Sequence, residues 1–74
     1  MGEMRVLSVD GDTKTIWDPR KSAEVITAEE QFEKLTDKGY IAYTVNKKGK
    51  KSKIMKKFDP DAEKMILTPP IVGG

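Results

Sequence analysis

The sequence predicts a small α+β domain, in which a mixed sheet of four or five short strands packs against one helix. Its 74 residues allow one compact unit with a modest hydrophobic core. Only 36% of the residues are hydrophobic, but they gather in short runs, which indicates a folded domain rather than a disordered chain. Runs with a strand period flank one run with a helix period, so the predicted order is strand, strand, helix, strand, strand, strand.

Two strands are expected in the first part of the chain. The β-prone run at residues 4–9 ends at Asp10-Gly11-Asp12, a sequence that is typical of hairpin turns. Residues 13–17 are the expected partner strand, and Pro19 ends it because proline has no N–H group to donate to a ladder. The polar residues 20–24 are expected to cross irregularly to the helix.

A helix is expected from Thr27 to Lys38. Thr27 and Glu30 have the spacing of a capping box, in which the two side chains satisfy free backbone N–H groups of the first turn. Gly39 stands where a left-handed residue commonly ends a helix. Ala28, Phe32 and Leu35 fall on one face at helical spacing and are predicted to face the core, and Val25 can extend this face from just before the helix.

Two further strands are expected directly after the helix. Residues 40–46 alternate in character, with larger apolar residues on one face and small residues on the other. The larger face consists of Ile41, Tyr43 and Val45, and the smaller face of Ala42 and Thr44. A lysine-rich turn at residues 47–51 leads to a return strand at residues 52–58, in which Ile54 and Phe58 are predicted to share a face.

The last strand follows an acidic turn. Asp59, Asp61 and Glu63 alternate along the chain, but they lack the glycine and the distant bidentate glutamate of a calcium loop. Because Asp-Pro-Asp is common in turns, we predict a turn and no metal site there. Residues 65–67 form a continuous apolar run, which suits a central strand buried on both faces or against a helix.

The residue types that the chain lacks exclude several kinds of chemistry. It has no cysteine and no histidine, which excludes thiol nucleophiles, Ser-His-Asp arrangements, disulfides and zinc sites built from Cys and His. No apolar run approaches the roughly 18 residues of a membrane span, and the first residues lack the apolar region of a signal peptide. We therefore expect a monomeric cytoplasmic protein that is not an enzyme, binds no cofactor and does not contact membranes.

The most specific motif lies in the last residues. Residues 1–68 are predicted to form the domain, and residues 69–74 a flexible tail that ends in Gly-Gly. Pro69 and Pro70 restrict the backbone to extended conformations, so they predict a stiff stalk after the last strand. Gly73 and Gly74 have no Cβ, so this part of the tail is slender enough to enter a narrow enzyme channel.

The element order, together with a last strand that leads into Pro-Pro-Ile-Val-Gly-Gly, resembles the β-grasp proteins typified by ubiquitin. Within that group, residues 67–74 are most similar to the tails of the small prokaryotic sulfur carriers and modifiers. These are the small subunit of molybdopterin synthase, the thiamine sulfur carrier and the archaeal ubiquitin-like modifiers. The resemblance in element order spans nearly the whole chain, whereas the specific sequence match covers only the tail.

The resemblance implies a mechanism in which the chain supplies only the carboxylate of Gly74. An E1-like enzyme would adenylate this carboxylate with ATP, and the acyl group would then pass to a thiol, to sulfide as a thiocarboxylate, or to a lysine amine of an acceptor protein. Gly73 and Gly74 would be the activated positions. Pro69, Pro70, Ile71 and Val72 would form the docking arm, and an exposed apolar patch on the sheet would complete the interaction surface.

The lysine-rich hairpin indicates an alternative function, which is nucleic-acid binding. A positive cluster attracts phosphates, and its candidate phosphate-binding residues are Lys47, Lys48, Lys50, Lys51 and Lys53, with Lys56 and Lys57 nearby. Tyr40, Tyr43 and Phe58 are candidates for stacking on bases. However, the net charge is only +2 and the cluster contains no arginine. Lysines also protect exposed strand edges from aggregation, which would explain the cluster without a nucleic-acid ligand. A third hypothesis is that the domain is an interaction module with another role.

Overall fold

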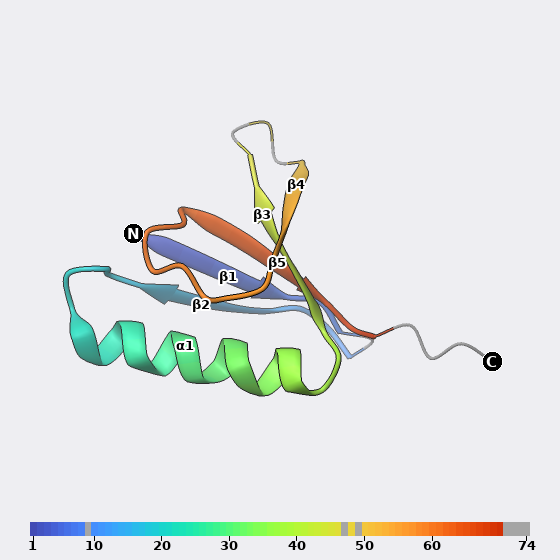
Figure 1. The fold of residues 1–74 in the computed structure, drawn as a ribbon, viewed down its shortest axis with the longest axis horizontal. Coiled ribbons are helices and arrows are strands. Elements are labelled where there is room, and N and C mark those ends of the chain that lie inside the picture. Colours follow the sequence, from blue (N-terminus) through green and yellow to red (C-terminus); the bar gives the residue numbers. More distant parts are fainter. Residues whose placement is uncertain (9, 47, 49, 71–74) are drawn as a thin grey trace.

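One helix lies across one face of a mixed sheet in the computed structural model (Figure 1). The structure describes residues 1–8, 10–46, 48 and 50–70. Within the last range, only the backbone of Lys51 is described. The elements in chain order are β1 (Gly2–Val6), β2 (Thr13–Trp17), α1 (Ser22–Asp37), β3 (Ile41–Val45), β4 (Lys51–Met55) and β5 (Lys64–Thr68). This confirms the predicted α+β class and the predicted succession of strands and helix.

The last strand, β5, occupies the centre of the five-stranded sheet, whose spatial order is β2-β1-β5-β3-β4. It runs parallel to β1 and antiparallel to β3, and the hairpins β1–β2 and β3–β4 form the two sides. Met65 and Leu67 are buried in the core with residues of α1, whereas Ile66 between them is half-buried on the opposite face. The prediction of a central strand at residues 65–67 is therefore confirmed.

The core lies between α1 and the sheet. Among the described residues, eight apolar side chains are buried in it: Met4, Val6, Trp17, Ala28, Phe32, Ala42, Met65 and Leu67. Ala28 and Phe32 come from α1, and Val25 and Leu35 pack at the margin of the core. This confirms the helix face that the spacing predicts. Complete burial of a side chain as large as Phe32 contributes about 1.5–3 kcal/mol to folding.

Trp17 connects distant parts of the chain. Its indole Nε1 donates a hydrogen bond to the backbone carbonyl of Pro60 at 3.0 Å, which ties the end of β2 to the connection between β4 and β5. Its ring lies 5.0 Å from the ring of Phe58, and Phe58 lies 5.7 Å from Phe32 on α1. An aromatic chain therefore joins the sheet edge, the β4–β5 connection and the helix.

The first strand lies earlier than the sequence predicts. β1 spans Gly2–Val6 rather than residues 4–9, because Gly2 pairs with Trp17 and leaves room for its ring. A Cβ added to Gly2 would lie 2.2 Å from the Trp17 ring atoms Cε2 and Cζ2. Before β2, the N–H of Gly11 donates to the carbonyl of Ser8 at 3.2 Å, which closes a turn, and Gly11 adopts a positive φ of 122°.

The predicted start of the helix is wrong. α1 begins at Ser22, and Thr27 lies inside the helix, where its Oγ1 donates to the carbonyl of Ala23 at 3.0 Å instead of capping the first turn. Lys21 is the N-cap, and its carbonyl accepts the N–H groups of Glu24 and Val25, each at 3.1 Å. The earlier start places Val25 in the first turn of α1, where it packs against the core. Of the expected irregular crossing at residues 20–24, only residues 20 and 21 lie outside the helix.

The predicted end of the helix is confirmed. Lys38 is the C-cap, and Gly39 has a φ of 98°, the left-handed conformation that favours glycine. The N–H of Tyr40 then donates to the carbonyl of Leu35 at 3.1 Å, so the turn satisfies one of the last free carbonyls of the helix.

The alternation in β3 is confirmed, but its smaller face contacts the helix. Ala42 is buried in the core, whereas Ile41 is 40% exposed on the side of the sheet away from α1. The helix and the sheet can approach closely at this point because Ala42 is small. In β4, Ile54 remains 62% exposed, while Phe58 lies beyond the strand and turns into the core. The prediction that Ile54 and Phe58 share a strand face is therefore wrong.

The close fit of Gly2 beneath Trp17 leads to a prediction about stability. Gly2→Ala introduces a methyl group that overlaps the indole, so it should lower the free energy of unfolding by about 1–3 kcal/mol. Chemical denaturation followed by circular dichroism measures this loss. In a Trp17→Phe background the six-membered ring of the indole is absent, and the same Gly2→Ala change should then cost less than half as much. Equal costs in both backgrounds would show that the ring contact is not responsible.

Candidate functional site

The described part of the docking arm begins at the end of β5. Pro69 and Pro70 are both exposed, in agreement with a chain that leaves the sheet after Thr68. A Cβ added to Gly39 would lie 3.3 Å from the Cβ of Pro70, so the base of the arm rests against the end of α1. The remaining predicted site residues, Ile71, Val72, Gly73 and Gly74, lie outside the described residues.

An apolar patch covers part of the sheet face opposite α1. Cross-strand pairing places Tyr43 between Ile54 of β4 and Ile66 of β5, and Ile41 lies two residues from Tyr43 on the same face. Ile54 and Ile41 are among the exposed large hydrophobic residues, and Tyr43 and Ile66 are half-buried. We call Ile41, Tyr43, Ile54 and Ile66 the outer-face patch. Sequence reasoning missed its membership because the pairing of β3 with β5 is not visible in local periodicity.

Charged residues lie on the same face, beside the outer-face patch. Arg5 pairs with Ile66 across β1 and β5 and with Lys14 across β1 and β2. Glu3 Oε2 lies 3.7 Å from Lys64 Nζ and 3.9 Å from Arg5 Nη2, and it has no hydrogen-bond partner among the described residues. These partly exposed ion pairs add little to stability, but they hold two cations next to the apolar side chains.

The structure describes only some of the candidate residues of the lysine-rich hairpin. Lys48, Lys50 and Lys53 are exposed, Lys51 is described by its backbone alone, and Lys47 lies outside the described residues. Oδ1 of Asn46 accepts the N–H groups of Lys48 at 2.9 Å and of Lys50 at 3.0 Å.

The neighbouring aromatic and basic residues lie at several places in the fold. Phe58 packs against Trp17 and Phe32 at the margin of the core. Lys56 and Lys57 line a cavity of about 240 Å³ together with two carboxylates of α1, Glu29 and Glu33. Tyr43 belongs to the outer-face patch, and Tyr40 is half-buried after the helix.

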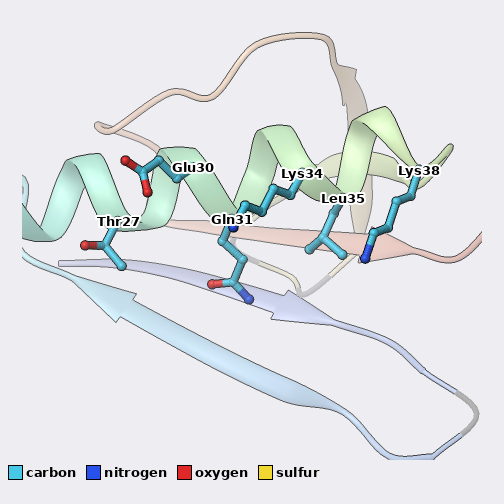
Figure 2. Close-up of a pocket in the computed structure, with 6 residues that line it drawn as sticks. All are labelled: Thr27, Glu30, Gln31, Lys34, Leu35 and Lys38. Carbon is cyan, nitrogen blue, oxygen red and sulfur yellow. The ribbon is translucent and has the colours of Figure 1, made fainter.

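A second depression lies on the other side of α1 (Figure 2). It has a volume of about 330 Å³, and its lining consists of Thr27, Glu30, Gln31, Lys34, Leu35 and Lys38. All six residues belong to α1 and its C-cap, and one of them, Gln31, accepts a hydrogen bond from Thr15 Oγ1 of β2 at 2.7 Å.

The acidic segment after β4 forms a turn, as predicted. The N–H of Asp61 donates to Asp59 Oδ1 at 2.9 Å, and the N–H of Ala62 donates to the carbonyl of Asp59 at 3.1 Å. The Asp59 side chain is therefore used to shape the backbone. Among the described residues, no group of three acidic side chains is placed to hold a metal ion.

One ion pair changes the pKa values of its members. A hydrogen bond from the guanidinium of Arg20 lowers the pKa of Asp18, and the same contact raises the pKa of Arg20. Arg20 is exposed and Asp18 is half-buried in the turn between β2 and α1, and the Nε–Oδ1 distance is 3.2 Å. Because the pKa of Asp18 is lowered, the pair stabilises the turn fully above the ordinary aspartate pKa, and this stabilisation is lost as the pH falls from that value through the lowered pKa of the folded protein.

Comparison of the chain with protein-family models, curated proteins and solved structures returned no match. Within the described ranges, no helix has both the length and the apolar character that a membrane span requires. The fold and surfaces thus define a small α+β domain with an apolar sheet face and an exposed, proline-rich exit from its central strand.

The lysine-rich hairpin leads to a prediction about nucleic acids. We expect no binding of single- or double-stranded oligonucleotides at physiological salt, because the net charge is only +2 and carboxylates of α1 line the same cavity as Lys56 and Lys57. Fluorescence anisotropy with labelled oligonucleotides measures this. A matched variant, Lys48→Glu with Lys50→Glu and Lys53→Glu, serves as the reference. Binding that weakens steeply with salt and disappears in this variant would establish the alternative function.

Proposed function

We propose that the chain is a ubiquitin-like sulfur carrier or protein modifier with a β-grasp fold, activated by adenylation of the Gly74 carboxylate. The observation that carries this proposal is the position of β5. The strand lies in the centre of the sheet and is paired with β1 and β3 on its two sides, so its end is held firmly. From that fixed point the chain continues through exposed Pro69 and Pro70 towards the Gly-Gly sequence.

Several features of the fold support assignment to the β-grasp group. A hairpin of two strands precedes the helix, three strands follow it, and the helix lies across one face of a mixed sheet (Figure 1). The last strand leads directly to the motif on which the resemblance to sulfur carriers depends. The lysine-rich turn between β3 and β4 is not a feature of that resemblance.

The proposed chemistry needs only a carboxylate from this chain. In the first step, an oxygen of the Gly74 carboxylate attacks the α-phosphate of ATP on the activating enzyme, which forms an acyl-adenylate and releases pyrophosphate. In the second step, a thiol, sulfide or lysine amine attacks the acyl carbon and AMP leaves. A free carboxylate on Gly74 in the working protein is a requirement of this mechanism. ATP is bound by the activating enzyme, and we propose no cofactor for the chain itself.

The outer-face patch supplies a surface on which the activating enzyme can dock. Ile54 and Ile41 are 62% and 40% exposed, so burial against a partner would contribute about half of the roughly 1.5–3 kcal/mol that complete burial of an isoleucine supplies. Arg5 and Lys64 beside the patch favour a partner with acidic residues around an apolar centre. We further propose that the protein acts as a monomer in the cytoplasm.

Intact-mass spectrometry of the protein from its own cells tests the proposal directly. A mass increase equal to the exchange of one oxygen for sulfur indicates a thiocarboxylate, and an isopeptide bond between Gly74 and a lysine of another protein indicates a modifier. A chain that continues beyond Gly74 in its working form, or that carries neither product, would contradict the proposal.

The tail leads to a prediction that separates folding from activation. Every buried residue of the described core lies at or before Leu67, so deletion of Gly73 and Gly74 should change the free energy of unfolding by less than about 0.5 kcal/mol. The same deletion should abolish ATP–pyrophosphate exchange by the activating enzyme. Gly74→Ala keeps the carboxylate but adds a methyl group, so it should slow this exchange without any effect on folding. Unfolding of the truncated chain would show that the glycines are structural.

The outer-face patch leads to a second prediction about activation. Ile54→Arg should leave stability within about 0.5 kcal/mol of the parent chain, because the side chain is exposed. It should raise the KM of the activating enzyme for this chain by about tenfold, because a charge would replace an apolar contact. Ile26→Arg is the matched control, because Ile26 is 53% exposed on α1, which lies on the opposite face of the sheet. Equal effects of both changes would exclude a specific role for the patch.

A further inference from the structure

We propose that the cavity between α1 and the segment after β4 binds a small zwitterion, namely a free α-amino acid with an aliphatic side chain. Its lining includes Glu29, Phe32, Glu33, Lys56, Lys57 and Phe58. We call it the mixed-charge cavity. No residue of the tail or of the outer-face patch belongs to it, so the proposal does not depend on activation of Gly74.

Two separate parts of the chain form the walls of the mixed-charge cavity. Glu29 and Glu33 lie four residues apart on α1, which places them on one side of the helix. Lys56 and Lys57 follow the end of β4, on the connection that passes beside the helix (Figure 1). The cavity therefore has acidic residues on one wall and basic residues on the other.

The four charged side chains leave their charges available to a ligand. All four are exposed, and none takes part in an ion pair within the described part of the chain. Like charges one turn apart on a helix repel, so a cation beside Glu29 and Glu33 relieves this repulsion. An anion beside Lys56 and Lys57 is attracted in the same way.

This separation of charge selects a ligand that carries both signs. A simple cation is attracted by the acidic wall and repelled by the basic wall, and the reverse holds for a simple anion. A zwitterion can place its ammonium group at the acidic wall and its carboxylate at the basic wall, so both interactions are favourable.

An aromatic floor adds a preference for an aliphatic group. Phe58 is half-buried, and its ring centroid lies 5.7 Å from that of buried Phe32. On its other side Phe58 lies 5.0 Å from Trp17, so neighbouring rings hold it in place. An aliphatic side chain that covers the exposed part of Phe58 removes apolar surface from water.

The volume of the mixed-charge cavity limits the size of the ligand. At about 240 Å³ it has the volume of about eight water molecules, because each takes about 30 Å³ in the liquid. Valine and leucine are molecules of this size, and both combine an ammonium group, a carboxylate and an aliphatic side chain. A longer peptide would not fit within the cavity.

The depression on the other side of α1 lacks this arrangement. Its lining belongs to the helix and its C-cap alone, so Glu30 and Lys34 stand on the same wall. A zwitterion cannot be held there between opposite walls. These two residues therefore provide a matched control on the same helix.

A titration of ¹⁵N-labelled full-length protein with L-leucine tests the inference. We expect saturable shifts of the Glu33, Lys57 and Phe58 amide signals, with a Kd in the millimolar range because the ligand has few atoms. Two probes each lack one charge: N-acetyl-L-leucine has no ammonium group, and L-leucinamide has no carboxylate. Each should bind about tenfold more weakly than leucine, because one wall no longer attracts it while the other attracts or repels as before.

Two double variants assign the walls. Glu29→Gln combined with Glu33→Gln should weaken leucine binding about tenfold and remove the preference for leucine over N-acetyl-L-leucine. Lys56→Gln combined with Lys57→Gln should also weaken leucine binding about tenfold, and it should remove the preference for leucine over L-leucinamide. All four side chains are exposed, so these changes should leave the fold intact.

The control variant combines Glu30→Gln with Lys34→Gln and should bind leucine as the parent protein does. Three results would each overturn the inference. The first is an absence of saturation at about 20 mM leucine, where a Kd of about 1 mM gives nearly full occupancy. The second is equal binding of leucine and its two single-charge analogues by the parent protein. The third is an equal loss of leucine binding in the control variant and in the two wall variants.

Discussion

The seating of Trp17 is the interaction on which the rest of the structure depends. The indole fills the space above Gly2, contacts Phe58, and donates its hydrogen bond to Pro60. These contacts fix the connection between β4 and β5, and so they help to bring β5 into the gap between β1 and β3. A strand in that central position is bonded on both sides, which makes it a firm support for whatever follows it.

Local sequence patterns predicted the parts of the fold that local interactions determine. The spacing of Ala28, Phe32 and Leu35 identified the buried side of the helix, and Gly39 identified its end because a left-handed turn strongly favours glycine. The capping box at Thr27 failed for a different reason. A helix beginning there would leave Val25 outside the regular turn that places it on the core, so tertiary packing overrode the local signal.

Other features could not be predicted because they depend on pairing between distant strands. The alternation in β3 distinguished two faces, but only its register with β5 shows that the small face contacts the helix. Phe58 had the spacing of a strand residue, yet it leaves β4 to meet Trp17. The outer-face patch arises from sheet order, whereas the Gly-Gly motif was visible at once because it is contiguous in sequence.

The contact between Gly39 and Pro70 has a mechanical consequence. A backbone with a positive φ and no side chain at residue 39 lets the proline ring lie directly against the end of α1. The end of α1 therefore supports the first residues of the segment that leaves the sheet. A larger residue at position 39 would press against Pro70 and change the direction in which the chain leaves β5. This direction therefore depends on the end of the helix as well as on the strand.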